Sequence, residues 1–294
     1  MNLGRCQICK GALVRELLVI HAPDRFELHA GVDPWGYRRR WIECERCGAA
    51  INVYPKTVAD KLAVISSAYY EVDFVEGDIG KKYEAVMTLP ETLSDNAQRV
   101  ARIRNFLGGF SPYDFSASRS VLDIGAGTGV FLAKFMLEEA NVGHHWRPIA
   151  IEPDPVAARH LRGLGLFDVR QSLFAEGHGF MGFDLCALNK VVEHVVDPVK
   201  LLREASRALS PAKGLLYVEV PAKETIVCRA EDDNILGALH NQLYDICSLN
   251  FAFQEAGLEP IRLERVYEPS GKISIVGFAV RPERVQALRG GGVK

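Results

Sequence analysis

The sequence predicts an α/β fold, in which helices cover both faces of a mostly parallel seven-stranded sheet, with a small cysteine-rich module in front of it. From residue 91 onward, short apolar strands alternate with helical segments, and parallel strands need such crossover helices. The last two strand-like runs are joined by a turn and form an antiparallel hairpin. Two Cys-x-x-Cys pairs lie within the first 50 residues. These three observations divide the chain into two parts.

The composition is that of an ordinary globular protein. The chain has 294 residues, of which 48% are hydrophobic and 24% charged, enough for one large or two smaller domains. Its 35 Lys and Arg against 37 Asp and Glu give a net charge of −2. Proteins that bind nucleic acid or anionic membranes usually have an excess of basic residues, and this chain does not. No apolar run approaches the roughly 18 residues of a membrane-spanning helix. We therefore expect a cytoplasmic protein.

The cysteine pairs predict a structural zinc site in a zinc-ribbon module over residues 1–55. The four residues that we expect to bind Zn²⁺ are Cys6, Cys9, Cys44 and Cys47. Four thiolates complete a tetrahedral site and leave no open position for catalysis. A redox role for one pair is the alternative, but it leaves the other pair unexplained. The 34 residues between the pairs leave room for a structured insertion.

The elements after this module follow in order. Residues 56–90 are a connector to which the sequence assigns no structure, and a helix begins at about residue 91. Asp95 and Gln98 are placed as a capping box, and Gly108-Gly109 ends the helix. One apolar stripe follows its length, formed by Ala97, Val100, Ile103 and Leu107. We assign residues 91–294 to one domain with a frayed glycine-rich tail.

Five strands are expected next. They cover residues 120–124, 149–152, 166–169, 183–188 and 215–220. Asp154-Pro155 and Asp197-Pro198 each combine an N-cap with a proline at the first helical position, which fixes two helix starts. A last helix over residues 248–257 precedes the hairpin of 260–268 and 272–281.

A glycine-rich loop at the end of the first of these strands is the most informative segment. Residues 123–129 read Asp-Ile-Gly-Ala-Gly-Thr-Gly; a dinucleotide fingerprint needs glycine at the place of Val130, and the Lys of a P-loop is absent. Asp123 would repel a pyrophosphate but would complement a ligand that carries an ammonium and a sulfonium. Glu152 ends the second strand, where a carboxylate accepts hydrogen bonds from both ribose hydroxyls.

These motifs resemble those of the class I S-adenosylmethionine-dependent methyltransferases. The resemblance covers roughly residues 91–281 and rests on the glycine loop, the acidic strand end IEPD and the segment FDLCALNKVVEHVVDPVKLLREASRALSPAKGLLYVEVP. It implies a Rossmann-like methyltransferase fold, with S-adenosylmethionine as the cofactor and S-adenosylhomocysteine as the product.

The resemblance also implies a cofactor site. Asp123 would lie near the amino group of the cofactor, Glu152 would hold the ribose, and Asn189 would line the cleft. The backbone contacts to the methionine portion would come from Gly125, Ala126, Gly127 and Gly129. The adenine would lie beside Pro153 and contact Ser172, which stands where many relatives have an acidic residue.

Two histidines are candidates for the catalytic base. The sulfonium methyl is already electrophilic, so the enzyme has to position a nucleophile and remove its proton. His194 follows the fourth strand and His240 follows the fifth, at the strand ends where an acceptor must lie. The segment His240-x-x-Leu-Tyr-x-x-x-Ser-Leu resembles the substrate-side histidine segment of small-molecule methyltransferases. A packing role between helices is the alternative for His194.

The combination of a four-cysteine module, the Tyr69-Tyr70 pair and this catalytic fold is similar to sugar methyltransferases of antibiotic and surface-polysaccharide pathways. We therefore expect a small-molecule or saccharide acceptor. Relatives that methylate sugar carbon usually carry a further C-terminal domain, so we expect O-methylation of a sugar hydroxyl. Three alternatives stay open: sugar C-methylation, RNA methylation with the ribbon gripping RNA, and a non-enzymatic zinc-bearing scaffold. Residues 1–60 hold nine Lys and Arg against seven Asp and Glu, too small a surplus to favour RNA.

Overall fold

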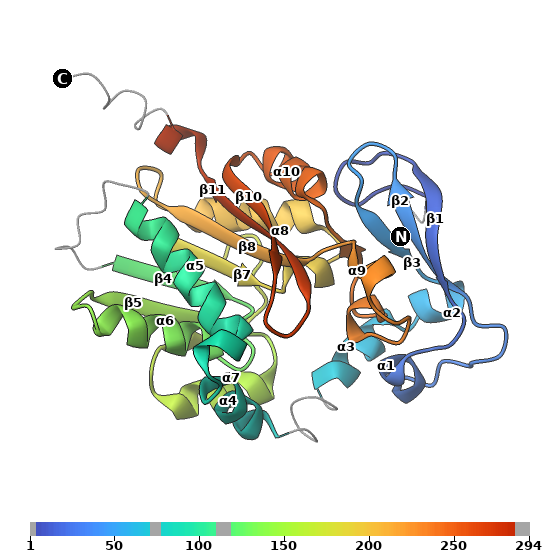
Figure 1. Cartoon of the computed structure of the whole chain (residues 1–294), viewed down its shortest axis with the longest axis horizontal. Helices are drawn as coiled ribbons and strands as arrows, with labels where there is room; N and C mark the ends of the chain where they lie inside the picture. Colours follow the sequence, from blue (N-terminus) through green and yellow to red (C-terminus); the bar gives the residue numbers. More distant parts are fainter. Residues whose placement is uncertain (1–3, 71–77, 110–118, 286–294) are drawn as a thin grey trace.

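The computed structural model describes residues 4–70, 78–109 and 119–285, and contains two β-sheets (Figure 1). The larger sheet has seven strands in the order β10-β11-β8-β7-β4-β5-β6. They are β4 (Arg119–Ile124), β5 (Trp146–Ile151), β6 (Asp168–Arg170), β7 (Leu185–Asn189), β8 (Leu215–Pro221), β10 (Glu259–Tyr267) and β11 (Ile273–Val280). The first five pair in parallel, and β11 is antiparallel to both β8 and β10. The predicted fold class is confirmed.

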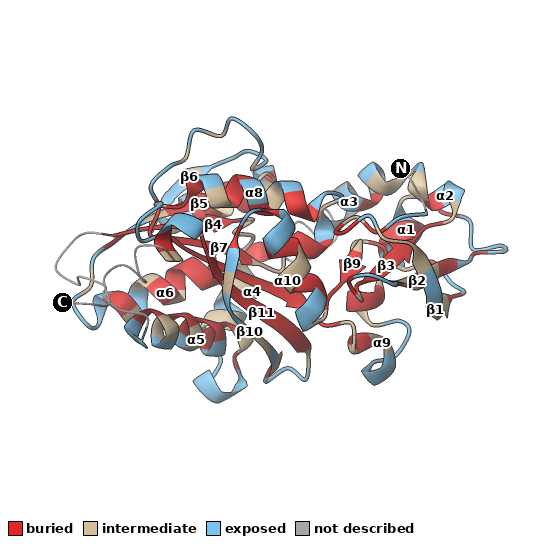
Figure 2. Ribbon diagram, turned by 90° about the horizontal axis from the view of Figure 1, so that it is seen from above, coloured by how far each residue is buried: buried red, intermediate tan, exposed pale blue. Residues whose placement is uncertain are grey.

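Helices cover both faces of this sheet. One face packs against α5 (Asp95–Gly109), α6 (Val130–Ala140) and α7 (Pro155–Leu164), and the other against α8 (Pro198–Ala208) and α10 (Ile246–Glu255). The central strands are buried on both sides, while the helices expose their outer surfaces (Figure 2). This burial explains why these strands have continuous apolar runs in the sequence.

The smaller sheet is antiparallel and has the order β1-β2-β3-β9. Its strands are β1 (Leu13–Ile20), β2 (Arg39–Cys44), β3 (Ala50–Val53) and β9 (Gln242–Leu243). Short helices α1 (Arg25–His29), α2 (Lys56–Ala59) and α3 (Leu62–Tyr70) accompany it. Because β9 comes from the segment after β8, two parts of the chain far apart in sequence build this sheet together (Figure 2).

The remaining elements are short. Helix α4 (Ile79–Met87) precedes α5, and α9 (Thr225–Cys228) follows β8. Single 3₁₀ turns are η2 (Glu91–Leu93), η3 (Val192–His194) and η4 (Asn234–Leu236). Residues 71–77, the side chains of Tyr69 and Tyr70, and the glycine-rich tail lie outside the described residues. Within the described part of the chain, no helix is long and apolar enough to cross a bilayer.

The expected capping box at the start of α5 is wrong. The hydroxyl of Ser94, one residue earlier than predicted, accepts the hydrogen bond from the backbone N–H of Ala97 at 3.1 Å. The Asp95 carboxylate instead accepts from the backbone N–H and the hydroxyl of Ser270, at 2.9 and 2.6 Å, in the hairpin turn. The apolar stripe of this helix is buried and Gly109 ends it, as predicted.

The predicted boundaries of the other elements differ by a few residues. Asp154 and Asp197 cap α7 and α8 with proline in the first turn, as expected. The last helix begins at Ile246, two residues earlier than predicted, because Asp245 and Ser248 form a capping box. Three helices, α2, α3 and α4, occupy parts of the connector that the sequence left unassigned.

Candidate functional site

The glycine loop joins β4 to α6, and its three glycines all adopt left-handed backbone angles. A Cβ atom at Gly125 would lie 2.7 Å from Val191 Cγ2, and one at Gly129 would lie 2.5 Å from Leu161 Cδ2. Both glycines are therefore needed for close packing inside the protein. At Gly127 nothing lies within 4 Å of the added Cβ, so this glycine faces open space that a ligand can enter.

The N–H groups of this loop are already used. Gly125 and Ala126 both donate to the carbonyl of Ile151, at 2.8 and 3.1 Å, and Gly129 donates to Ala126 at 2.8 Å. Gly127 N–H donates to Glu152 Oε2 at 2.8 Å. Since the described geometry leaves none of these N–H groups for a phosphate, the loop differs in function from the phosphate-binding loops that it resembles in sequence.

Glu152 follows β5 and is 3% exposed. Its two oxygens accept hydrogen bonds from the backbone N–H groups of Gly127 and Asp154, at 2.8 and 2.9 Å. Burial raises the pKa of this carboxyl group. The two hydrogen bonds fix the carboxylate beside the glycine loop, and each oxygen keeps a second lone pair for a ligand hydroxyl.

Asp123 and Asn189 lie side by side on neighbouring strands. Asn189 Nδ2 donates to Asp123 Oδ1 at 3.2 Å, and Asn189 Oδ1 is buried without a hydrogen-bond partner among the described residues. Burial raises the pKa of Asp123 to about 7. A buried carboxyl group beside an unused carbonyl oxygen favours a cationic hydrogen-bond donor. The ammonium group of S-adenosylmethionine has this chemistry, so the residues fit the expected cofactor.

The adenine residues are less enclosed. Pro153 is half-buried next to Glu152, whereas Ser172 is exposed beyond the end of β6. Ser172 N–H donates to the carbonyl of Arg170 at 3.1 Å. The contacts of these two residues with adenine stay predictions.

The two candidate histidines lie against each other. Their rings have centroids 4.6 Å apart and planes at 30°, although the residues are 46 positions apart in the chain. His194 Nδ1 lies 2.9 Å from the carbonyl of Leu239, and His240 Nδ1 is buried without a partner among the described residues. Burial, followed by the nearby His194 and Lys190, lowers the pKa of His240 well below its ordinary value. His240 is therefore neutral at neutral pH.

Glu193 is a functional candidate that the sequence analysis missed. It is fully buried, and neither carboxylate oxygen has a hydrogen-bond partner in the described part of the chain. Burial raises the pKa of Glu193 to about 8. Donor atoms of Glu193, His194 and His240 lie within 4.8 Å of one another, a set that could also hold a transition-metal ion. The position of Glu193 directly before His194 is the signal that the sequence offers, but the sequence does not reveal that Glu193 is buried.

The four cysteines of the N-terminal module come together as their spacing predicts. Cys6 Sγ lies 3.5 Å from Cys47 Sγ, and Cys9 Sγ lies 3.4 Å from Cys44 Sγ. All four sulfurs lie within 4.8 Å of one another, and the cysteines are buried and not disulfide-bonded. Tetrahedral Zn–S bonds of about 2.3 Å place sulfurs about 3.8 Å apart, so the donor set fits zinc.

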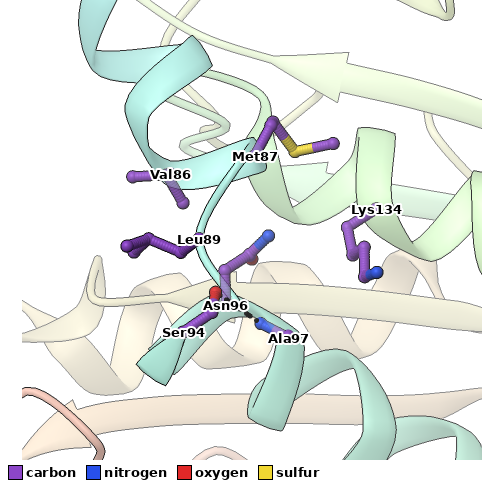
Figure 3. A pocket seen from close by; sticks show the side chains of 7 residues that line it. All are labelled: Val86, Met87, Leu89, Ser94, Asn96, Ala97 and Lys134. Carbon is purple, nitrogen blue, oxygen red and sulfur yellow. Dashed lines mark hydrogen bonds between the residues drawn. The ribbon is translucent and has the colours of Figure 1, made fainter. Parts of the chain in front are cut away.

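A pocket lies between α4, the start of α5 and α6 (Figure 3), where its lining residue Asn96 donates to the carbonyl of Val130, directly after the glycine loop, at 2.8 Å. Its lining residues are Val86, Met87, Leu89, Ser94, Asn96, Ala97 and Lys134. Lys134 forms ion pairs with Glu91 and Glu138, at 3.2 and 2.8 Å. None of the predicted site residues lines this pocket.

The fold and the glycine loop define the class of protein: this is a class I S-adenosylmethionine-dependent methyltransferase fold. A family model described as a methyltransferase domain matches residues 93–263, more than half of the chain. The chain belongs to this methyltransferase family.

Known relatives support the same assignment. An uncharacterised methyltransferase of Mycobacterium marinum is 30% identical over 160 residues, which cover 53% of this chain and 54% of the relative. A second, from Mycobacterium ulcerans, has the same identity and coverage. The chain thus spans about half the length of the curated relatives it matches.

A solved structure shares the fold. The 1,6-didemethyltoxoflavin-N1-methyltransferase of Burkholderia thailandensis, with bound 1,6-didemethyltoxoflavin and S-adenosylhomocysteine, has a TM-score of 0.52 and 18% identity. The match covers 81% of this chain and 96% of that chain. Identity at this level supports the fold alone.

Proposed function

We propose that the protein transfers the methyl group of S-adenosylmethionine to a saccharide hydroxyl group, with His240 as the general base. The observation that carries the proposal is the stacked pair of His194 and His240 at the carboxyl end of the sheet that also bears the glycine loop. Ligands of such sheets bind at this end of the strands. Sugar C-methylation by the same base is the alternative.

The cofactor half of the site would consist of Asp123, Gly127, Glu152 and Asn189. Bound S-adenosylmethionine supplies an electrophilic methyl group. In this proposal Asp123 and Asn189 hold its ammonium group, and Glu152 accepts hydrogen bonds from the ribose hydroxyls. Gly127 leaves the space that the methionine portion needs. Gly125 and Ala126 fix the loop through their hydrogen bonds to Ile151, and Gly129 through its hydrogen bond to Ala126.

The acceptor half would contain His240 as the base. Its lowered pKa keeps the ring neutral at pH 7, and a neutral imidazole can take the proton of a sugar hydroxyl. His194 would support the ring by stacking. The buried Glu193, protonated at neutral pH, adds no negative charge beside the reacting oxygen.

The N-terminal cysteines would hold one structural Zn²⁺ per chain. We propose residues 1–55 as the zinc module, 56–90 as the connector and 91–294 as the methyltransferase domain. We propose a cytoplasmic location, since a reducing compartment favours zinc-bound thiolates over disulfides. Metal analysis of the purified protein should find about one zinc per chain, and two or none would contradict the assignment.

Calorimetry tests the cofactor site. S-adenosylmethionine should bind the wild type, and Glu152→Ala should weaken binding at least tenfold, because the ribose hydroxyls lose their acceptor and the N–H of Gly127 is left unpaired. Glu176→Ala is the matched control, since the side chain of Glu176 is 69% exposed. A wild type that does not bind S-adenosylmethionine would refute the proposal.

A labelled-methyl screen tests the acceptor. Nucleotide sugars, glycans, small phenols and bulk RNA should be compared, with transfer expected to sugar oxygen; transfer to carbon, nitrogen or RNA would identify one of the alternatives. With the identified acceptor, His240→Gln should lower kcat by about 10²- to 10⁴-fold while the Kd of S-adenosylmethionine stays unchanged. Turnover that requires added Mg²⁺ or Mn²⁺ would instead assign Glu193, His194 and His240 to a metal site.

A further inference from the structure

We infer that the zinc module forms part of the acceptor side of the active site, with Asn52 and Tyr54 as positioning residues that hold His240 against His194. This inference rests on the proposed function, in which His240 is the base. It assigns a role in the reaction to a module that the cysteines by themselves mark only as structural.

The segment that carries His240 is built into the zinc module. Leu236, Ala238 and Leu243 belong to the same apolar cluster as Trp41 and Tyr54. The carbonyl of Leu236 accepts hydrogen bonds from Arg39 Nη1 at 2.7 Å and from Trp41 Nε1 at 3.4 Å. The N-cap carboxylate of α1, Asp24, accepts from Ala238 N–H at 2.6 Å. Further side chains of the module thus fix the backbone leading to the histidine.

The backbone of His240 itself is held by strand β3 and the residue after it. Asn52 Nδ2 donates to the carbonyl of His240 at 2.8 Å, and Asn52 N–H donates to the carbonyl of Asn241 at 2.9 Å. The Tyr54 hydroxyl lies 2.8 Å from the carbonyl of Ala238 and 3.1 Å from that of His240. Both side chains are nearly buried, with Asn52 5% and Tyr54 6% exposed, so water competes little for these bonds.

The opposite side of the same segment is hydrogen-bonded to η3, the turn that follows strand β7. Asn241 Nδ2 donates to the carbonyl of His194 at 2.7 Å, and Asn241 N–H donates to that of Glu193 at 2.8 Å. Gln242 Nε2 donates to Val192 at 2.8 Å. Residues 239–242 therefore connect the zinc module to η3, and the distance between the two imidazole rings depends on both attachments.

The chemistry makes this placement matter. A general base must lie within hydrogen-bond reach of the proton it removes, about 2.6–3.2 Å. A displacement of about 1 Å can cost 10²-fold in rate. Loss of the Asn52 donor removes the shorter of the two side-chain hydrogen bonds to the carbonyl of His240, so the segment should lose its fixed position relative to η3. The cofactor residues lie on β4, β5 and β7 and should be unaffected.

Two variants test the inference: Asn52→Ala and Tyr54→Phe. We expect kcat to fall about 10- to 100-fold, with the Kd of S-adenosylmethionine within twofold of wild type. Arg38→Ala is the matched control, since Arg38 is an exposed side chain of the same module that pairs with Glu16. It should keep wild-type kcat. Circular dichroism should show that each variant is folded, and metal analysis should show that each binds as much zinc as the wild type.

A readout independent of activity is the imidazole signal of His240 in NMR spectra of histidine-labelled protein, identified by its loss in His240→Gln. In Asn52→Ala this signal should shift, and its titration midpoint should rise toward that of an ordinary histidine as water reaches the ring. An unchanged signal, or a shifted signal with wild-type kcat, would overturn the inference. Full turnover in His240→Gln would refute the assignment of His240 as the base. The NMR shift in Asn52→Ala would still test separately whether Asn52 holds His240 in place.

Discussion

Asp123 illustrates how burial prepares a single residue for a cationic ligand. Burial raises its pKa to about 7 despite the hydrogen bond from Asn189 and the charge of Arg99, so the carboxyl group is partly protonated at neutral pH in the absence of a cationic ligand. Because the pKa in the folded state lies above that in the unfolded chain, the contribution of Asp123 to folding is present at acidic pH and is lost as pH rises through about 7. A bound ammonium and sulfonium would reverse this preference and favour the carboxylate.

This linkage predicts a pH-dependent cofactor affinity. Between pH 5.5 and 7.5 the affinity for S-adenosylmethionine should rise with pH, by at most tenfold per unit below the pKa of Asp123, because binding requires the loss of one proton. Asp123→Asn should bind more weakly and lose most of this pH dependence. Calorimetry at three pH values measures both effects. Asp168→Asn, an exposed aspartate on β6, serves as the control, and an equally steep profile in Asp123→Asn would contradict the explanation.

The glycine loop shows, at the level of an element, how one motif serves two purposes. Gly125 and Gly129 are required by neighbouring side chains, whereas Gly127 borders open space. Sequence alone gives the three glycines equal status, since each occupies the same alternating pattern. Their different roles depend on Val191 and Leu161, which come from other elements of the fold.

Alanine substitutions at two of these glycines should therefore separate stability from binding. Gly127→Ala should cost about 1–2 kcal/mol, the strain of a left-handed residue, and should weaken S-adenosylmethionine binding. Gly129→Ala combines the same strain with a contact of 2.5 Å to Leu161, so it should cost more, about 3 kcal/mol or above. Urea unfolding followed by calorimetry on the folded fraction measures both. Equal losses of stability would show that Leu161 moves aside without cost.

Elements defined by local patterns could be predicted from the sequence, and those defined by distant contacts could not. The strands of the large sheet and the proline-capped helices follow from apolar runs and caps. The start of α5 was misplaced because Ser94 and Asp95 are both good caps, and Asp95 is recruited by Ser270 in the distant hairpin. Strand β9 has two residues and forms by pairing with β3. It is too short to show the alternation of apolar and polar residues by which a strand is predicted.

The candidate site likewise has residues whose position the sequence predicts and contacts that it does not predict. The positions of Asp123, Glu152 and Asn189 at strand ends follow from the sequence, because strand ends of a parallel sheet meet at one edge. The stacking of His194 on His240 depends on β9, so the sequence could name both residues but could not predict their contact. Glu193 was missed because nothing local distinguishes a buried glutamate from an exposed one.

At the scale of the whole molecule, the N-terminal four-cysteine module and the methyltransferase part share apolar cores. The four cysteines pack in the same cluster as Tyr244, Leu249 and Phe253 of the methyltransferase part. Conversely, apolar side chains of residues 234–243, from the methyltransferase part, complete the core of the N-terminal module. The two parts should therefore unfold in one cooperative transition, although the sequence divides them by composition.

An ion cluster at this junction provides a test. Lys223 Nζ lies 2.9 Å from Glu43 Oε1, 2.8 Å from Asp245 Oδ2 and 2.7 Å from the carbonyl of Gly48, next to the second cysteine pair. The lysine thus joins strand β2, the loop of the second cysteine pair and the N-cap of α10. Its hydrogen bonds lower the pKa of Glu43 and Asp245 against the opposing effect of burial.

Lys223→Met should destabilise the whole molecule in one transition. Two carboxylates would lose their shared cation, and since the lysine side chain is 22% exposed we expect about 1–3 kcal/mol rather than the larger cost of a fully buried pair. Lys200→Met, at a lysine that is 56% exposed, should change stability by less than about 0.5 kcal/mol.

Because the pKa values of Glu43 and Asp245 are lowered in the folded protein, the contribution of these two carboxylates to stability is present above about pH 4 and is lost as pH falls. The difference between Lys223→Met and wild type should accordingly shrink in urea titrations at acidic pH. A separate early transition in Lys223→Met would instead mean that the module unfolds alone and that the junction, not the shared cores, makes the wild type cooperative.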